Sequence, residues 1–197
     1  MDEKTMTVNE AIKKYNPQRP YTYADYASWE DDPRCELIDG EIVVMEAPSV
    51  AHQRVIRELF VQLAVYLKGK QCEAFFAPFD VCLFGKGDED TTVVQPDILI
   101  ICNDSKLDTK RCNGAPDMVI EVLSPSTSKH DKHRKLSKYM NAGVREYWIV
   151  DPIEKSVSVN IFDSEPIFIG YYQADETVPV YVLDGFEISL QDVFKQV

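Results

Sequence analysis

The chain has 197 residues, of which 45% are hydrophobic and 11% aromatic, and its 21 basic and 33 acidic side chains give a formal net charge of -12. This length suits a single domain with enough apolar material for a buried core, which excludes a wholly disordered chain or a coiled coil. So acidic a surface also disfavours a protein that coats DNA irrespective of sequence, because it repels phosphates unless basic residues gather or a metal ion bridges the contact.

The first five residues carry charge where a secretory signal would be apolar, and no run reaches the roughly 18 to 20 apolar residues of a membrane span. We therefore expect a soluble, cytoplasmic protein that does not contact a membrane. The cysteines are odd in number, scattered and never paired as C-x-x-C. This pattern favours neither a disulfide framework nor a zinc ribbon.

We expect residues 1–20 to form an arm or a short helix and residues 21–197 to form one domain, because no repeat, low-complexity tract or linker interrupts the chain. Residues 22–30 open with a good N-cap and predict a short helix. An Asp-Gly pair between two apolar runs predicts a hairpin over 36–45. Apolar residues spaced three and four apart then predict an amphipathic helix over 52–68.

Most of the remaining chain is expected to form strands. Its apolar runs predict strands over 73–76, 79–84, 93–102, 117–123, 145–150 and 156–162, with shorter ones over 171–190. The polar stretch 103–116 predicts a loop, and 129–141 predicts a helix that Gly143 ends. This order lacks regular βαβ alternation. It predicts a mixed α/β or α+β fold with a central mixed sheet, flanking helices and additional strands towards both ends.

Two acidic residues stand among strongly apolar strand residues. Asp97 precedes four aliphatic residues, and Glu121 lies inside the apolar run 118–123. Burying a polar group without a partner costs on the order of several kcal/mol, so each carboxylate requires a compensating cation. Two such carboxylates on adjacent strands would suit Mg²⁺ or Mn²⁺, which could polarise a phosphodiester and help deprotonate water. The simpler alternative is that Asp97 caps a strand and Glu121 pairs with a lysine.

Five blocks of the sequence occur in the order that is typical of one family. They are 35–41 (CELIDGE), 47–53, 94–98 (VQPDI), 114–127 and 143–152. Over about residues 22–190 the chain resembles the Uma-type restriction endonuclease family. The resemblance implies the restriction-endonuclease-like PD-(D/E)xK fold and a divalent metal site that hydrolyses DNA. It makes Asp97 and Glu121 the catalytic metal ligands, but Leu123 stands where the superfamily has its lysine.

The same resemblance implies that a lysine of the following helix replaces the missing one. Lys135 and Tyr139 are four residues apart and share a helix face, so both could point at the sheet. Lys135 would then orient or help activate the attacking water and offset charge in the transition state, with Tyr139 in support. The alternative is that Lys135 forms an exposed pair with Asp131, worth about 0.3 to 0.5 kcal/mol.

Glu36 matches the acid that the family contributes ahead of the long helix, and we expect it to complete or support the metal shell. Its alternative is an exposed glutamate at a strand end. His52 and Gln53 begin the long helix, where backbone amides favour a phosphate. Gln53 is expected to support the site, whereas His52 is expected to cap or pack. The basic segment 129–138 either receives a phosphate backbone or forms a solvated helix face.

These observations favour a Mg²⁺- or Mn²⁺-dependent endonuclease that acts on DNA. A second hypothesis is a catalytically weak or inactive nuclease fold that binds nucleic acid or protein, which the leucine at position 123 and the net charge of -12 support. A third is a structural homo-oligomer whose acids form internal salt bridges. Strands at both ends leave edges that a symmetric partner commonly covers, so we expect a homodimer.

Overall fold

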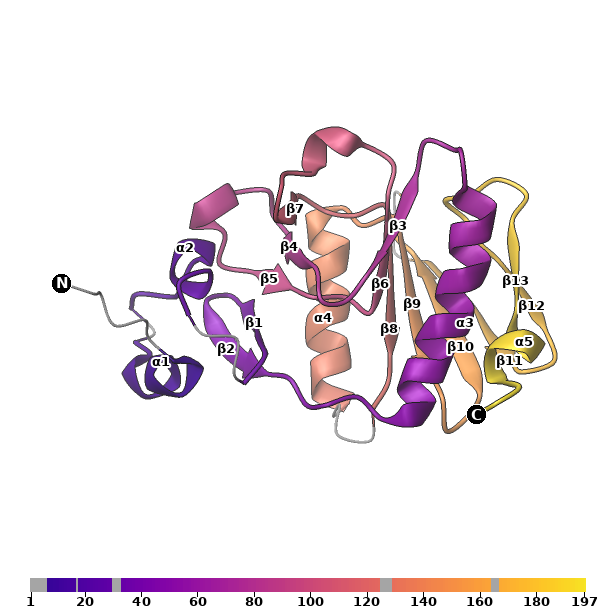
Figure 1. Ribbon diagram of the computed structural model, residues 1–197, viewed down its shortest axis with the longest axis horizontal. Helices are drawn as coiled ribbons and strands as arrows, with labels where there is room; N and C mark the ends of the chain where they lie inside the picture. Colours follow the sequence, from indigo (N-terminus) through magenta and orange to yellow (C-terminus); the bar gives the residue numbers. More distant parts are fainter. Residues whose placement is uncertain (1–6, 17, 30–32, 125–128, 164–166) are drawn as a thin grey trace.

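Helices and strands both contribute to the computed structural model, which describes residues 7–16, 18–29, 33–124, 129–163 and 167–197 (Figure 1). Its helices are α1 (Val8–Lys14), α2 (Tyr23–Tyr26), α3 (Val50–Leu67), α4 (Lys129–Ala142) and α5 (Leu190–Phe194), with short 3-10 turns η1 (Gly87–Glu89) and η2 (Asp104–Lys106). Within these ranges, no helix is long and apolar enough to span a bilayer. Helix α1 begins with a capping box of Thr7 and Glu10 and falls in the expected N-terminal arm.

The strands form three sheets. The largest has the order β11-β10-β9-β8-β6-β3 and consists of β3 (Glu73–Phe76), β6 (Ile98–Ile101), β8 (Met118–Val122), β9 (Glu146–Asp151), β10 (Ser156–Ile161) and β11 (Ile167–Gln173). The second has the order β2-β1-β5-β4-β7 and consists of β1 (Cys35–Ile38), β2 (Glu41–Val44), β4 (Asp80–Cys82), β5 (Val93–Val94) and β7 (Arg111–Asn113). Strands β12 (Thr177–Pro179) and β13 (Glu187–Ser189) form the third.

The large sheet is mixed, and its inner strands β6 and β8 are buried on both faces. Strands β8 and β9 are parallel, whereas β6 pairs with β8 and β3 in antiparallel fashion. Ile98 and Ile100 pack in the same cluster as the buried face of α3, and Leu99 and Ile101 pack on the other side with Tyr139 of α4. Helices α3 and α4 therefore cover opposite faces of the sheet (Figure 1). This arrangement confirms the expected mixed α/β fold.

The predicted hairpin is present as β1 and β2. Asp39 and Gly40 both have positive φ angles, 57° and 76°, and join the Ile38–Glu41 pair in the two-residue turn that twisted strands favour. A Cβ atom on Gly40 would clash with Pro20, so this position also requires glycine for space. After the hairpin the chain enters α3, which begins at Val50, two residues earlier than predicted.

The prediction of one strand over 93–102 is wrong. Strands β5 and β6 belong to different sheets, and Gln95, Pro96 and Asp97 separate them. Proline has no N–H group and cannot continue a ladder of hydrogen bonds, so the chain changes sheets here. The expected loop over 103–116 also contains β7, which pairs in parallel with β4. The break places Asp97 at the boundary between the two larger sheets.

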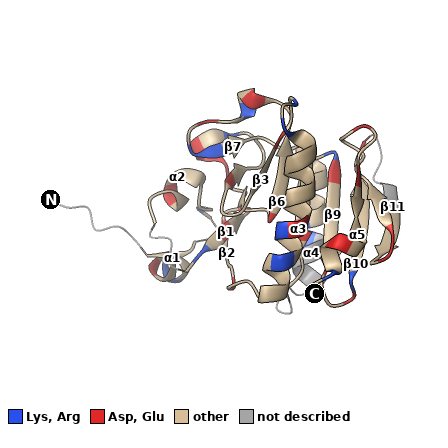
Figure 2. Ribbon diagram, turned by 45° about the vertical axis from the view of Figure 1, so that its right-hand side comes forward, with Lys and Arg blue, Asp and Glu red and all other residues tan. Residues whose placement is uncertain are grey.

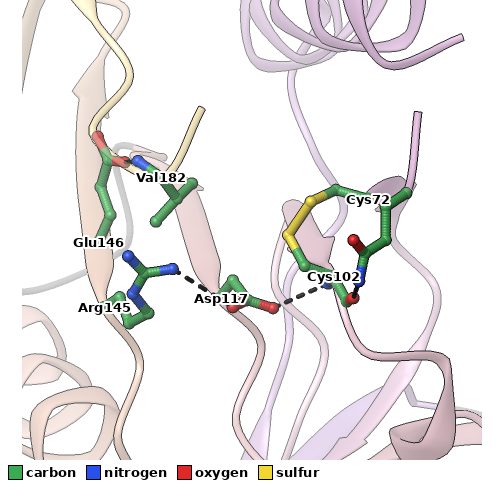
Figure 3. Close-up of a disulfide and its surroundings, with 7 residues drawn as sticks. Cys72, Cys102, Asp117, Arg145, Glu146 and Val182 are labelled. Carbon is green, nitrogen blue, oxygen red and sulfur yellow. Dashed lines mark hydrogen bonds and ion pairs between the residues drawn. A yellow bond between two sulfur atoms is a disulfide. The ribbon is translucent and has the colours of Figure 1, made fainter. Parts of the chain in front are cut away.

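A disulfide corrects the expectation drawn from the cysteines. Cys72 and Cys102 are bonded, with Cα atoms 3.9 Å apart, because they are the next facing positions beyond the last β3–β6 pair. Figure 3 shows that the Cys102 N–H donates to Asp117, at 2.8 Å, and that Arg145 lies on the other side of this carboxylate. The bond therefore fixes one end of the β3–β6 ladder. Buried thiols account for the other cysteines, Cys35, Cys82 and Cys112.

Candidate active site

Asp97, the residue directly before β6, lies opposite Glu121 of β8. Ile98 and Ile120 form the last pair of the β6–β8 ladder, so Asp97 and Glu121 are the next facing positions. The Val122 N–H donates to Oδ2 of Asp97 at 2.7 Å, which fixes that carboxylate against β8. Both acids line one cavity of about 280 Å³, and their side chains are 14% and 15% exposed. The register brings together the two residues that the sequence singled out.

Lys135 of α4 reaches the same cavity. Its ammonium nitrogen lies 2.9 Å from both carboxylate oxygens of Glu36 and 3.0 Å from Oε1 of Glu121. Tyr139, one turn further along the helix, donates its hydroxyl to the same Glu121 oxygen at 2.6 Å. Lys135 is therefore not the exposed lysine of the alternative interpretation, and the side chain of Asp131, its suggested partner there, lies outside the described residues. The alternative that Glu121 pairs with a lysine is confirmed, and this lysine is Lys135.

Glu36 is buried and only 2% exposed, so the alternative that it is an exposed glutamate at a strand end is wrong. It lies on β1 of the smaller sheet and accepts the Gln95 N–H at 2.8 Å in addition to the Lys135 ammonium. Gln95 precedes Asp97 in the segment that crosses between sheets, and its amide donates to Asp80. Glu36 therefore links the smaller sheet to α4 and to the segment that carries Asp97.

His52 contacts the site more closely than the sequence indicated. Its backbone N–H donates to the side chain of Ser49, which caps α3, and its Nε2 lies 3.3 Å from Oδ2 of Asp97. The hydrogen bond and charge of Asp97 outweigh the effect of burial and raise the pKa of His52 above its ordinary value. Nδ1 of His52 is buried and has no hydrogen-bond partner among the described residues. Gln53, next on the helix, is exposed and lines the cavity.

The charges in the cavity influence one another strongly. Burial raises the pKa of Glu121 to about 7, with further contributions from the charges of Asp97 and Glu36, while Lys135 opposes the shift. Burial alone would lower the pKa of Lys135, but the carboxylates of Glu121 and Glu36 outweigh it and raise that pKa above its usual value. Burial and the charge of Glu121 raise the pKa of Tyr139. Among the described residues of the cavity, Glu36, Glu121 and Asp97 therefore influence one another, and the Lys135 ammonium contacts the first two.

The described cations of α4 do not form a free phosphate-binding face. Arg134 donates to the Ile38 carbonyl and to Glu41, and Lys138 donates to Asp39. These acceptors belong to the β1–β2 hairpin, which therefore docks on the helix through charge pairs. The side chains of residues 129–133, also part of the predicted basic patch, lie outside the described part of the structure. Figure 2 shows basic and acidic residues interspersed along the ribbon.

The side chains of the cavity offer a hard divalent ion two carboxylate ligands. In the ranges that the structure covers, no group of three or more His, Cys, Asp or Glu side chains has the arrangement of a metal site. Magnesium, however, is commonly bound through one or two carboxylates together with waters and substrate phosphates. Asp97 and Glu121 provide such a pair, and the mutual repulsion that raises the pKa of Glu121 is the kind that a cation relieves.

A family model described as "Putative restriction endonuclease", Uma2, matches residues 23–191. This chain belongs to the Uma2 family. A crystal structure of a "putative nuclease belonging to DUF820" from Anabaena variabilis has the same fold, with a TM-score of 0.72 and 23% identity over 89% of this chain and 98% of that one. Two uncharacterized Synechocystis proteins are also similar. The protein slr1290 is 25% identical over 177 residues, which are 82% of this chain and 87% of slr1290, and sll1609 is 26% identical over 135 residues, which are 66% and 74%.

Membership of the Uma2 family confirms the resemblance read from the sequence, and together with the fold it indicates a nuclease. The structure brings Asp97, Glu121, Lys135 and Glu36 to one cavity, with Gln53 at its lining and Tyr139 behind Glu121. Sequence reasoning missed the contacts of His52 and Gln95. A histidine near the start of a helix and a glutamine before Pro96 were visible signals, but their partners depend on how the two larger sheets meet.

Proposed function

We propose that this Uma2-family chain is a divalent-metal-dependent endonuclease that hydrolyses phosphodiester bonds of DNA. The observation that carries the proposal is that Asp97, Glu121 and Lys135, which come from three elements, line one cavity. Asp97 and Glu121 would hold Mg²⁺ or Mn²⁺. A bound ion would supply Lewis-acid polarisation of the phosphate and a water of lowered pKa.

The remaining side chains would position the reactants. Lys135 reaches into the cavity from the face opposite α3, so its ammonium can contact a phosphate oxygen or the attacking water and offset developing charge. Glu36 holds that ammonium from the smaller sheet and supports the metal shell. The Tyr139 hydroxyl fixes one oxygen of Glu121. Gln53, exposed at the lining, can donate its amide to a phosphate oxygen.

Nicking of supercoiled plasmid with Mn²⁺ tests this proposal. Wild type should nick, EDTA should stop it, and Asp97→Asn and Glu121→Gln should each abolish it. Glu187→Gln, at an exposed position on β13 outside the cavity, is the matched control and should cut like wild type. Mn²⁺ should also raise the melting temperature of wild type but not of Asp97→Asn, because a ligand of the folded state stabilises it by mass action. Equal cutting by all variants would reveal a contaminating nuclease and defeat the proposal.

A binding module without hydrolysis is the second candidate. Two observations favour it: Leu123 occupies the usual lysine position, and the replacement Lys135 is already engaged by two carboxylates. Wild type that binds DNA but fails to cut it with either metal at any salt concentration would establish this candidate over the endonuclease.

A homodimer is part of the proposal. Strands β3 and β11 are the outer strands of the large sheet, and outer strands offer unpaired backbone groups to a partner. Sedimentation at micromolar concentration should show a species of twice the chain mass. A single 22.5 kDa species would reject the dimer.

A further inference from the structure

The cavity has both apolar and charged lining residues. The apolar ones, here called the apolar wall, include Val43 and Val44 of β2, Met45, Pro48, Ile56 of α3 and Phe76 of β3. Asp97, Glu121, Lys135 and Glu36, here called the charged end, also line it, as do Arg34 and Glu46. Val44 is 45% exposed and Phe76 is 53% exposed, so both side chains offer apolar surface to solvent. Exposed apolar groups that gather next to a site commonly contact its ligand.

Contacts with Phe60 and with neighbouring backbone fix the position of the Phe76 ring. Its ring packs edge-to-face against Phe60 of α3, with centroids 4.7 Å apart and an interplanar angle of 73°. Phe76 pairs with Ile98 across the β3–β6 ladder, and the following Ala77 N–H donates to the Asp97 carbonyl at 3.1 Å. Backbone hydrogen bonds therefore couple the position of the exposed ring to that of Asp97.

From this arrangement we infer that the cavity takes a nucleotide whose base is unpaired, with the base against Phe76 and the apolar wall and the phosphate at the charged end. The inference rests on the proposed function and adds the structural class of the DNA. A base in a duplex is stacked on both faces and paired at its edge, so it cannot cover this wall. An unstacked base can, because every base has a π-face that stacks on an aromatic side chain.

The net charge of the protein also favours an unpaired base over a duplex. A net charge of -12 opposes a long duplex, whose affinity derives mostly from phosphate contacts. The described cations Arg134 and Lys138 are engaged by the hairpin, so neither of these two is free to follow a duplex backbone. Contacts to one base would compensate for weak phosphate contacts. The cavity, at about 280 Å³, is slightly smaller than most small-molecule sites, which span roughly 300 to 1,000 Å³.

Fluorescence anisotropy with Ca²⁺ in place of Mg²⁺ or Mn²⁺, so that a hard cation still offsets the carboxylates, tests the inference with three labelled probes: a thymine 12-mer, an abasic 12-mer of equal charge, and a 12-base-pair duplex. Gel electrophoresis checks that each probe stays intact. Wild type should bind the thymine strand about tenfold more tightly than the other two, since stacking on one aromatic residue is worth about that factor. Phe76→Ala should lose this preference without changing the affinity for the abasic strand, whereas Phe76→Trp should keep it. Val65→Ala, an exposed apolar position on α3 outside the cavity, is the control and should behave as wild type.

The binding and nicking experiments together distinguish a failure of the inference from a failure of the proposed function. Equal binding of the thymine and abasic strands, or preference for the duplex, overturns the inference even if plasmid nicking with Mn²⁺ is observed. Base-dependent binding without nicking under any metal overturns the endonuclease but supports the base site. If Phe76→Ala instead turns a dimer into a monomer in sedimentation, the wall is an interface between two copies and the inference is wrong.

Discussion

The ammonium nitrogen of Lys135 lies 3.0 Å from Oε1 of Glu121, and each of these side chains is only 15% exposed. A charge pair this deeply buried contributes little net stability relative to apolar residues, but removal of one partner leaves the other charge without compensation. Because Glu36 shares the same ammonium, loss of Lys135 would leave two buried carboxylates unpaired. The site is therefore also a point on which the stability of the fold depends.

Lys135→Met should lower the free energy of unfolding by about 3 to 5 kcal/mol, the usual cost of breaking a buried pair. Lys138→Met is the matched control on the same helix. Lys138 pairs with Asp39, which is 55% exposed, so its loss should cost no more than about 1 kcal/mol. Urea denaturation at pH 7 measures both. An equally small decrease in the free energy of unfolding of both variants would contradict the burial of Lys135. Tests of catalysis at this position therefore require a check of folding for each variant.

The pH dependence of stability should report on Glu121. The pKa of this carboxyl is about 7 in the fold and near 4.5 in the unfolded chain, so its stabilising contribution is present below about 4.5 and declines as pH rises towards 7. Lys135 stays protonated over this range and adds no slope. The free energy of unfolding of wild type relative to Glu121→Gln should therefore fall between pH 4.5 and 7 and level off above 7. A difference that rises with pH would show that the pKa of Glu121 is lowered instead.

The hairpin turn can be tested through its glycine. Gly40→Ala introduces a Cβ against Pro20 at a φ of +76°, whereas Gly69→Ala has nearly the same φ, +77°, and open space around it. Both variants incur the cost of a left-handed alanine, about 1 to 2 kcal/mol, but only Gly40→Ala adds overpacking of about 1 to 3 kcal/mol. Thermal unfolding of the two variants should separate these effects. Equal destabilisation would show that Pro20 moves aside freely.

The disulfide should stabilise the oxidised protein. Cys72 and Cys102 are 30 residues apart. In the chain-entropy description, closure of a loop of this length lowers the entropy of the unfolded chain and so stabilises the folded protein by about 3 to 4 kcal/mol. The double variant Cys72→Ser/Cys102→Ser, or wild type in a dithiol reductant, should therefore unfold at lower urea concentration. An unchanged midpoint on reduction would mean that the bond does not form in solution.

Local signals in the sequence predicted most of the fold. The Asp39-Gly40 turn, the spacing of apolar residues in α3 and the glycine that ends α4 each act over a few neighbouring residues. The run 93–102 was misleading because apolar residues stand on both sides of the three residues Gln95, Pro96 and Asp97. Strands in two different sheets and one long strand have the same composition, and only Pro96 marked the change of sheet.

The candidate site was predictable in its members but not in its pairings. Asp97 and Glu121 were recognisable because charge is costly among aliphatic neighbours. The contacts of Lys135 with Glu36, 99 residues away, and of His52 with Asp97 depend on how α3, α4 and two sheets pack together. The disulfide depended on the β3–β6 register in the same way, which no spacing rule for cysteines can provide.

The covalent link between Cys72 and Cys102 encloses both the exposed Lys86 and Asp97 in one ring of chain. A tryptic cut after Lys86 would divide the polypeptide into a piece that contains Glu36 and a piece that contains Asp97, Glu121 and Lys135. The sulfur bond would hold these pieces together. Such nicked protein would migrate as a single band in non-reducing electrophoresis and as two bands after reduction.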